Sequence, residues 1–231
     1  MSVDVEIYEQ QSHLLGRNKV HDERSRAFAL PTTPIDRSTW RDKKIRIYDP
    51  RPNPNQPVGC CTMCAKAMQL NAAGNRKAGR VLDMDWALDG YVWETHNDPF
   101  AGAWNRDGSG EDTGSNGLAS CKTAQHTGDG AEYQWIFTGA DGIIQAVMDG
   151  KAISVGTKWY GDMFEVDAKG YLNPTGGMVG GHQWIVRGYD LSEDAAFGLC
   201  WWGRFREFKI KRTALDGLVR DGGDAHWQRT I

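Results

Sequence analysis

The chain has 231 residues, of which 40% are apolar and 25% charged, a composition that suits one large globular domain or two smaller lobes. Its formal net charge of −3 argues against a nucleic-acid partner, and its apolar runs are too short to span a bilayer. The polar, acidic start of the chain lacks the basic and apolar regions of a secretory signal. We therefore expect neither nucleic acid nor membrane among its partners.

The cysteines predict free thiols. There are five, at positions 60, 61, 64, 121 and 200, and the odd count and crowding are atypical of a disulfide framework. Zinc binding by the first three with Cys121 or a histidine is an alternative, but a second well-separated ligand pair is missing. We expect no metal and no cofactor.

Residues 1–57 are predicted to form an extended N-terminal arm. Prolines at 31, 34, 50, 52, 54 and 57 limit regular elements there to short pieces, because proline fixes φ and lacks an amide donor. The alternating segment 44–48 is predicted to be one short strand.

Helices are expected next. Apolar spacing predicts a helix over 61–74 and another over 115–127. A third is predicted over 141–150, with Asp141 as its cap and Gly150 at its end.

The period then changes to that of strands. Residues 153–159 alternate, and 183–189, 196–202 and 204–210 are further predicted strands before a short helix from Thr213. Helices followed by strands favour an α+β fold. We expect a helical lobe over about 58–150 and an antiparallel β-rich lobe over about 151–231.

Cys61 and His182 are the candidate reacting groups. Cys61 lies where the proline-rich arm ends and a helix begins, and a helix N-terminus stabilises a thiolate. His182 follows two glycines at the start of a predicted strand. Each residue alone is more often structural, but the pair suits nucleophilic catalysis. The other histidines, His226 among them, lack a pattern and are expected at the surface or at caps.

Several segments resemble papain-like cysteine peptidases. Residues 56–65 resemble the nucleophile segment of that family, 180–189 its histidine strand, and 202–210 its C-terminal segment. Segments 21–27 and 112–117 resemble stretches of compact bacteriophage-encoded members. The resemblance covers residues 15 to 224 and implies a two-lobed papain-like fold.

The resemblance also implies roles for individual residues. Cys61 would be the nucleophile and His182 the acid and base, while Gln56 would donate to the oxyanion. Cys60 is the alternative nucleophile by its spacing from Gln56, whereas Cys61 fits the residues that follow. Gly114, Ser115, Gly181 and Trp202 would form the substrate site, with Trp202 shielding the histidine.

Two positions depart from the family pattern. The spacing between Gln56 and Cys61 is one residue shorter than usual, as if one glycine of the turn were missing. Cys200 stands where the family has the asparagine that orients the histidine. A thiol is a weak hydrogen-bond partner for an imidazole. Asp190 is another candidate for that orienting role.

Two functions follow as hypotheses. The first is a thiol hydrolase, a peptidase that cleaves amide bonds through an acyl-enzyme on Cys61; acyl transfer would use the same groups. The alternative is a catalytically inactive papain-like scaffold that serves in a phage capsid, tail or assembly step by binding. The arm would then contact other phage proteins, or cover the cleft as a propeptide does. The expected location is the host cytoplasm or the virion.

Overall fold

A computed structural model describes residues 3–48, 56–201 and 207–231. Its α-helices are α1 (Cys61–Leu70), α2 (Met84–Asn97), α3 (Gly117–His126), α4 (Gly139–Met148) and α5 (Arg212–Arg220). Its strands are β1 (Val3–Glu6), β2 (Lys19–Asp22), β3 (Lys43–Lys44), β4 (Gly130–Trp135), β5 (Ile153–Tyr160), β6 (Met178–Asp190), β7 (Ala195–Leu199), β8 (Glu207–Lys211) and β9 (Asp224–Thr230). Short 3-10 helices are η1 (Glu23–Phe28), η2 (Arg37–Thr39) and η3 (Gly161–Phe164).

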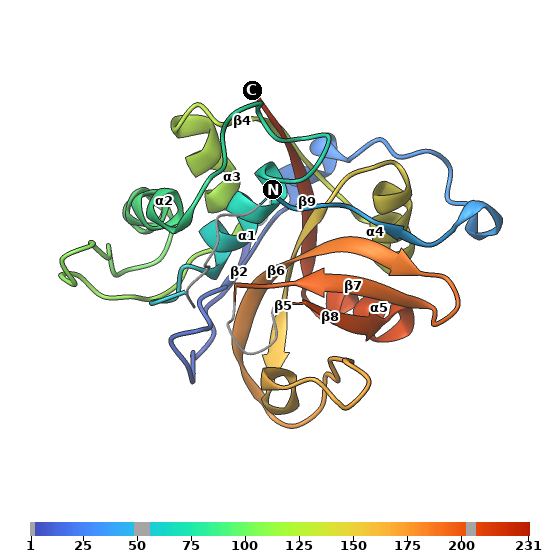
Figure 1. The fold of residues 1–231 in the computed structure, drawn as a ribbon. Helices are drawn as coiled ribbons and strands as arrows, with labels where there is room; N and C mark the ends of the chain where they lie inside the picture. The colour runs from blue at the N-terminus through green and yellow to red at the C-terminus, as the bar shows by residue number, and fades with distance from the viewer. Residues whose placement is uncertain (1–2, 49–55, 202–206) are drawn as a thin grey trace.

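The main sheet has seven strands, in the order β4-β9-β5-β6-β7-β8 with β3 added beside β6. Strands β1 and β2 form a separate two-stranded sheet. All these pairings are antiparallel. The expected α+β class is therefore confirmed. The long strand β6 is central in the sheet, where it pairs with β3, β5 and β7 (Figure 1).

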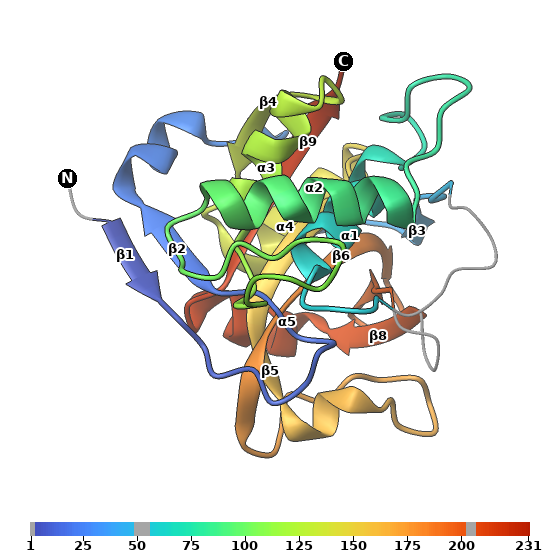
Figure 2. The ribbon, with the colours of Figure 1, turned by 90° about the vertical axis from the view of Figure 1, so that its left-hand side faces the viewer.

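Helices cover the sheet on two sides. Helices α1, α2 and α3 pack on one another, and α1 lies against β6. Helices α4 and α5 pack together on the other side, against β5, β6 and β8 (Figures 1 and 2). Although β4 and α4 precede residue 151, they pack with the strand lobe. One apolar core fills the space between the sheet and α4 and α5, and a second lies between α1, α2 and β6.

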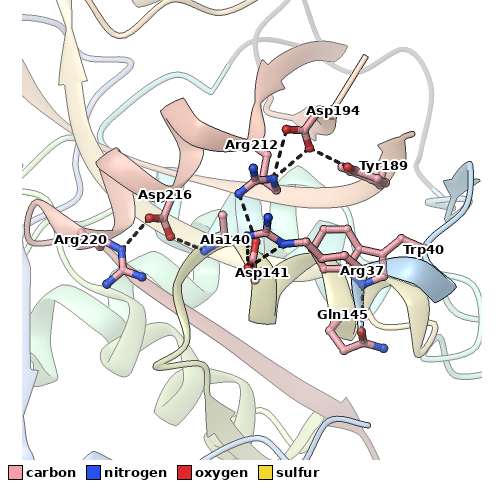
Figure 3. Close-up of polar contacts among 10 residues, drawn as sticks. All are labelled: Arg37, Trp40, Ala140, Asp141, Gln145, Tyr189, Asp194, Arg212, Asp216 and Arg220. Carbon is pink, nitrogen blue, oxygen red and sulfur yellow. Dashed lines mark hydrogen bonds and ion pairs between the residues drawn. The ribbon is translucent and has the colours of Figure 1, made fainter. Parts of the chain in front are cut away.

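The start of α4 differs from the expectation. Thr138 is the N-cap and makes no side-chain capping bond, and Asp141 lies in the first turn. Asp141 instead forms ion pairs with Arg37 of the arm and Arg212 of α5 (Figure 3). The Asp141 carboxylate therefore connects α4 to the arm and to α5, and a local capping pattern does not reveal contacts with such distant residues. At the other end Gly150 adopts a φ of 87°, a conformation that suits the end of a helix.

The N-terminal arm packs on its own chain. Trp40 donates its indole N–H to Oε1 of Gln145 on α4 at 2.9 Å, and its ring meets Tyr189 edge-on (Figure 3). Beyond it, Lys44 of the short strand β3 lies opposite Gly188 of β6. These contacts fix the arm to the strand lobe.

Helix α2 and strands β4 and β9 were not predicted. The buried residues of α2 include Gly90, Tyr91 and Glu94, so its inward face carries no plain apolar stripe. In β9 the buried residues include His226 and Gln228, which are polar. None of the helices in the described ranges is long and apolar enough to cross a membrane.

Candidate active site

Cys61 is the first residue of α1, and its side chain is fully buried. The preceding turn is held by Asp112, whose carboxylate accepts the Gly59 amide at 2.7 Å. Residues such as Ala65, Ala67 and Leu70 favour helix and pack on β6 and α2. The start of α1 is thereby fixed against the strand lobe.

His182 lies on β6 opposite Thr157 of β5, and 1% of its surface is exposed. The edge of its ring meets Trp159 with centroids 4.8 Å apart. The backbone N–H of the next residue, Gln183, donates to the thiol of Cys61. The start of α1 and this part of β6 are thus in contact, which brings the neighbourhoods of Cys61 and His182 together.

Burial keeps both groups neutral. It raises the pKa of the Cys61 thiol far above its ordinary value, although the Gln183 amide acts in the opposite direction. Burial also lowers the pKa of His182 to about 3, against the effect of a hydrogen bond to the Leu14 carbonyl. A thiolate–imidazolium pair requires both pKa values to move the other way. In this structure both groups are therefore neutral near pH 7.

The N-terminal chain contributes to the burial of His182, which hydrogen-bonds the Leu14 carbonyl. Residues 8–18, which we call the cleft segment, run between the two lobes before entering β2 (Figure 2). The amides of Gly16 and Arg17 both donate to the Gly181 carbonyl at 3.1 Å. On the helical side Ser115 donates to the Gly16 carbonyl at 2.7 Å and accepts from Asn18 at 2.6 Å. Residues 16–18 are thus held by backbone bonds on both sides, whereas residues 11–14 form a turn.

Glycines make this close approach possible. A Cβ at Gly114, where φ is 75°, would lie 2.3 Å from the Gly16 carbonyl oxygen. At Gly181 a Cβ would lie 2.1 Å from the Arg17 oxygen, and at Gly16 it would lie 1.8 Å from the Gly59 oxygen. Three of the residues expected to bind substrate, Gly114, Ser115 and Gly181, thus contact the cleft segment.

The remaining expected site residues lie as follows. Gln56 is buried, and its side-chain amide donates to the Val58 carbonyl at 3.0 Å, within its own loop. Cys200 follows β7 and is buried in the apolar core of the strand lobe. Trp202 lies outside the described residues. Asp190 is at the far end of β6, roughly 26 Å from His182 at the usual strand rise, so it does not orient that ring.

A buried ion pair lies beside this site, and the sequence did not point to it. Arg17 has no exposed surface and donates through Nη2 to Asp224 at 2.5 Å and to the Gly222 carbonyl at 3.1 Å. Burial acts to raise the pKa of Asp224, but Arg17 and His226 outweigh it and hold the pKa at about 2.

His226 is also fully buried, contrary to the expected surface position. It faces Cys121, whose sulfur accepts from Lys66 at 3.2 Å. Burial acts to raise the pKa of Cys121, yet His226 and Lys66 lower it to about 7. No local signal marked these residues, because they come from α1, α3 and β9.

All five cysteines are among the described residues, and each is buried and outside a disulfide. The sulfurs of Cys60 and Cys64 are 3.6 Å apart within α1. In the described ranges, no group of three or more histidine, cysteine, aspartate or glutamate residues is arranged to hold a metal ion.

No protein-family model matches this sequence, and no curated protein matches it. Solved structures do. Xylellain, a cysteine protease from Xylella fastidiosa, superposes with a TM-score of 0.71 at 14% identity, over 96% of this chain and 98% of that one. The procathepsin B S9 of Trypanosoma congolense gives 0.59 at 9% identity, over 95% and 87%. At this identity the likeness shows the fold alone: the chain has the α+β fold of papain-like cysteine peptidases.

Proposed function

We propose that this protein is a papain-like thiol hydrolase that acts as a peptidase and is held in a latent state by its cleft segment. One observation carries the proposal. Cys61 begins a helix that abuts the strand bearing His182, and residues 16–18 of the N-terminal chain bond through their backbone both to Gly181, next to His182, and to Ser115 on the helical side. A site that binds its own chain in this way has the shape to bind another peptide.

The chemistry proceeds on Cys61 once the segment leaves. The thiolate attacks the amide carbonyl, the carbon–nitrogen bond breaks, and His182 gives its proton to the leaving amine. Water then gives a proton to the neutral His182 and attacks the thioester; the carbon–sulfur bond breaks, the carboxylic acid leaves and the Cys61 thiolate is restored. The Cys61 amide stabilises the oxyanion, and Gln56 adds a donor after releasing the Val58 carbonyl.

Opening the cleft also activates the pair. Both groups are neutral because burial disfavours their charged forms. Water that replaces residues 8–18 removes this penalty, and the helix N-terminus then favours the thiolate. Latency and burial therefore have the same cause in this chain.

Thiol labelling tests the proposal. The full chain and a Gly16→Ala variant are treated with limiting iodoacetamide from about pH 5 to about pH 9, and adducts are mapped by mass spectrometry. The added methyl meets the Gly59 backbone and should loosen the segment. We expect selective labelling of Cys61 in the variant at a pH below that of an ordinary thiol.

Two further substitutions are made in the Gly16→Ala background: one is a control, and the other tests the imidazole partner of Cys61. Cys60→Ala removes the neighbouring buried thiol and should leave the labelling of Cys61 intact. His182→Ala should abolish its low-pH labelling. Uniform, slow labelling of all cysteines, insensitive to His182, would refute the hydrolase.

A second function is favoured by Cys200. The position that orients the histidine in the family is a thiol buried in the apolar core here. An inactive papain-like scaffold is the corresponding proposal: a bacteriophage virion or assembly component in the host cytoplasm or the particle. It would bind other phage proteins through its arm. The labelling experiment separates the two, because a scaffold needs no reactive Cys61.

A further inference from the structure

We propose that the pocket around Asp224 recognises a guanidinium group, so that peptides entering the cleft present an arginine to it. This inference rests on the proposed function, because it names the substrate class of the same cleft. Arg17 of the cleft segment now fills the pocket and serves as a built-in occupant.

The pocket is formed by backbone and side chain together. Asp224 lies opposite Arg17, and the Gly222 carbonyl supplies a second acceptor for the same nitrogen. Gly156 provides the room: a Cβ there would lie 2.7 Å from Nε of Arg17 and 2.9 Å from Oδ1 of Asp224. The ring of Tyr8 lies 5.7 Å from the guanidinium carbon. Any side chain at position 156 would close this space.

The chemistry favours a cation over a neutral group, and the guanidinium of Arg17 is the cation that the structure places there. Besides the bonded oxygens, Oδ1 of Asp224 and Oε1 of Gln183 have no hydrogen-bond partner among the described atoms. Both face the space beside Gly156. Nη2 of Arg17 makes both bonds, whereas Nε and Nη1 have no hydrogen-bond partner among the described atoms, so the pocket discriminates by charge: a neutral group would leave the carboxylate unpaired.

Charge also opposes an empty or apolar pocket. Asp224 stays ionised because Arg17 and His226 offset its burial. Nδ1 of His226 is 3.8 Å from Oδ1 of Asp224, and this imidazole also interacts with Cys121 and Lys66. Without Arg17, the Asp224 carboxylate retains its interaction with His226, which is shared with Cys121 and Lys66. Binding of a cation is therefore favourable because it pairs with the buried carboxylate, whereas binding of an apolar side chain is unfavourable because it leaves that carboxylate without a cation.

The pocket is tied to one position of the bound peptide. The residue whose side chain enters it is also the residue whose amide bonds to the Gly181 carbonyl and that pairs with Ser115. Because the bonds to both lobes involve only backbone atoms, they place a bound peptide in the same register whatever its sequence. The selection of arginine then falls on a single residue of the peptide.

The first experiment uses the full chain with Arg17→Ala, which leaves the pocket vacant. Ethylguanidinium is compared with ethylurea, its neutral analogue, by calorimetry. Because hydrogen bonds to charged groups contribute more than neutral ones, we expect ethylguanidinium to bind about 10- to 100-fold more tightly. Adding Asp224→Asn should abolish the difference. Equal binding of the two probes, or a preference that survives Asp224→Asn, would overturn the proposal.

A second experiment needs no variant, so it decides the matter even if Arg17→Ala fails to fold. The unmodified chain is incubated with acetyl-Leu-Gly-Arg-Asn-amide or with its citrulline counterpart, and amide exchange is followed in residues 14–18. The arginine peptide should displace the segment and speed exchange, and the citrulline peptide should not. Equal effects would overturn the proposal. Neither readout needs a reaction at Cys61, so a failed hydrolase with retained arginine preference, and the reverse, are distinguishable.

Discussion

Acidification should destabilise the fold through His182, because burial lowers the pKa of this imidazole from 6.5 to about 3. Between these values the unfolded chain binds a proton at His182 and the folded chain does not. The stability that depends on the neutral ring is therefore complete above pH 6.5, and it is lost as the pH falls toward 3.

The magnitude follows from the two pKa values. One unit of pKa difference corresponds to about 1.4 kcal/mol. Between about pH 7.5 and about pH 5, protonation of the unfolded chain at His182 alone should lower the free energy of unfolding by about 2 kcal/mol. The loss continues at about 1.4 kcal/mol per pH unit until the folded imidazole also titrates.

Urea unfolding of the full chain and of His182→Gln at a series of pH values measures this effect. The glutamine keeps a polar side chain of similar size and does not titrate. The difference between the two curves isolates His182, because other groups contribute equally to both. His13→Gln, at an exposed histidine, is the matched control and should follow the unmodified chain. Parallel curves for His182→Gln and the unmodified chain would refute the neutral buried imidazole.

Two further changes test other contacts. Arg17→Met should lower the free energy of unfolding by about 3 kcal/mol in urea, the lower end for a broken buried pair, because the Asp224 side chain keeps 13% exposure. Arg17→Met with Asp224→Asn should recover much of this loss, and equal losses for the single and double variants would contradict the ion pair. Asp216→Ala removes an acceptor 3.0 Å from the Ala140 amide at the start of α4 and should cost about 1 kcal/mol in thermal unfolding. Asp216→Asn, which retains an oxygen there, should cost less; an equal loss would show that the cap contributes little.

The sequence by itself determined the elements whose signals are local. The helix starting at Cys61, the end of α4 shortly before Gly150 and the strand carrying His182 all follow from short-range spacing. Together with the resemblance they were sufficient for the α+β, papain-like fold. Helix α2 was not predicted from the sequence because its buried face includes Glu94 and lacks an apolar periodicity.

The tertiary structure alone decided the state of the site. Arg17 and Asp224 are near opposite ends of the chain, so no window of sequence shows their pairing. The same holds for the cleft segment, which becomes a cover only when the Gly16 backbone meets Gly181 across the fold. Burial then sets the protonation of Cys61, against the preference of its helix terminus for a thiolate. Sequence patterns name the candidate reacting groups, whereas desolvation depends on which distant residues exclude water from them.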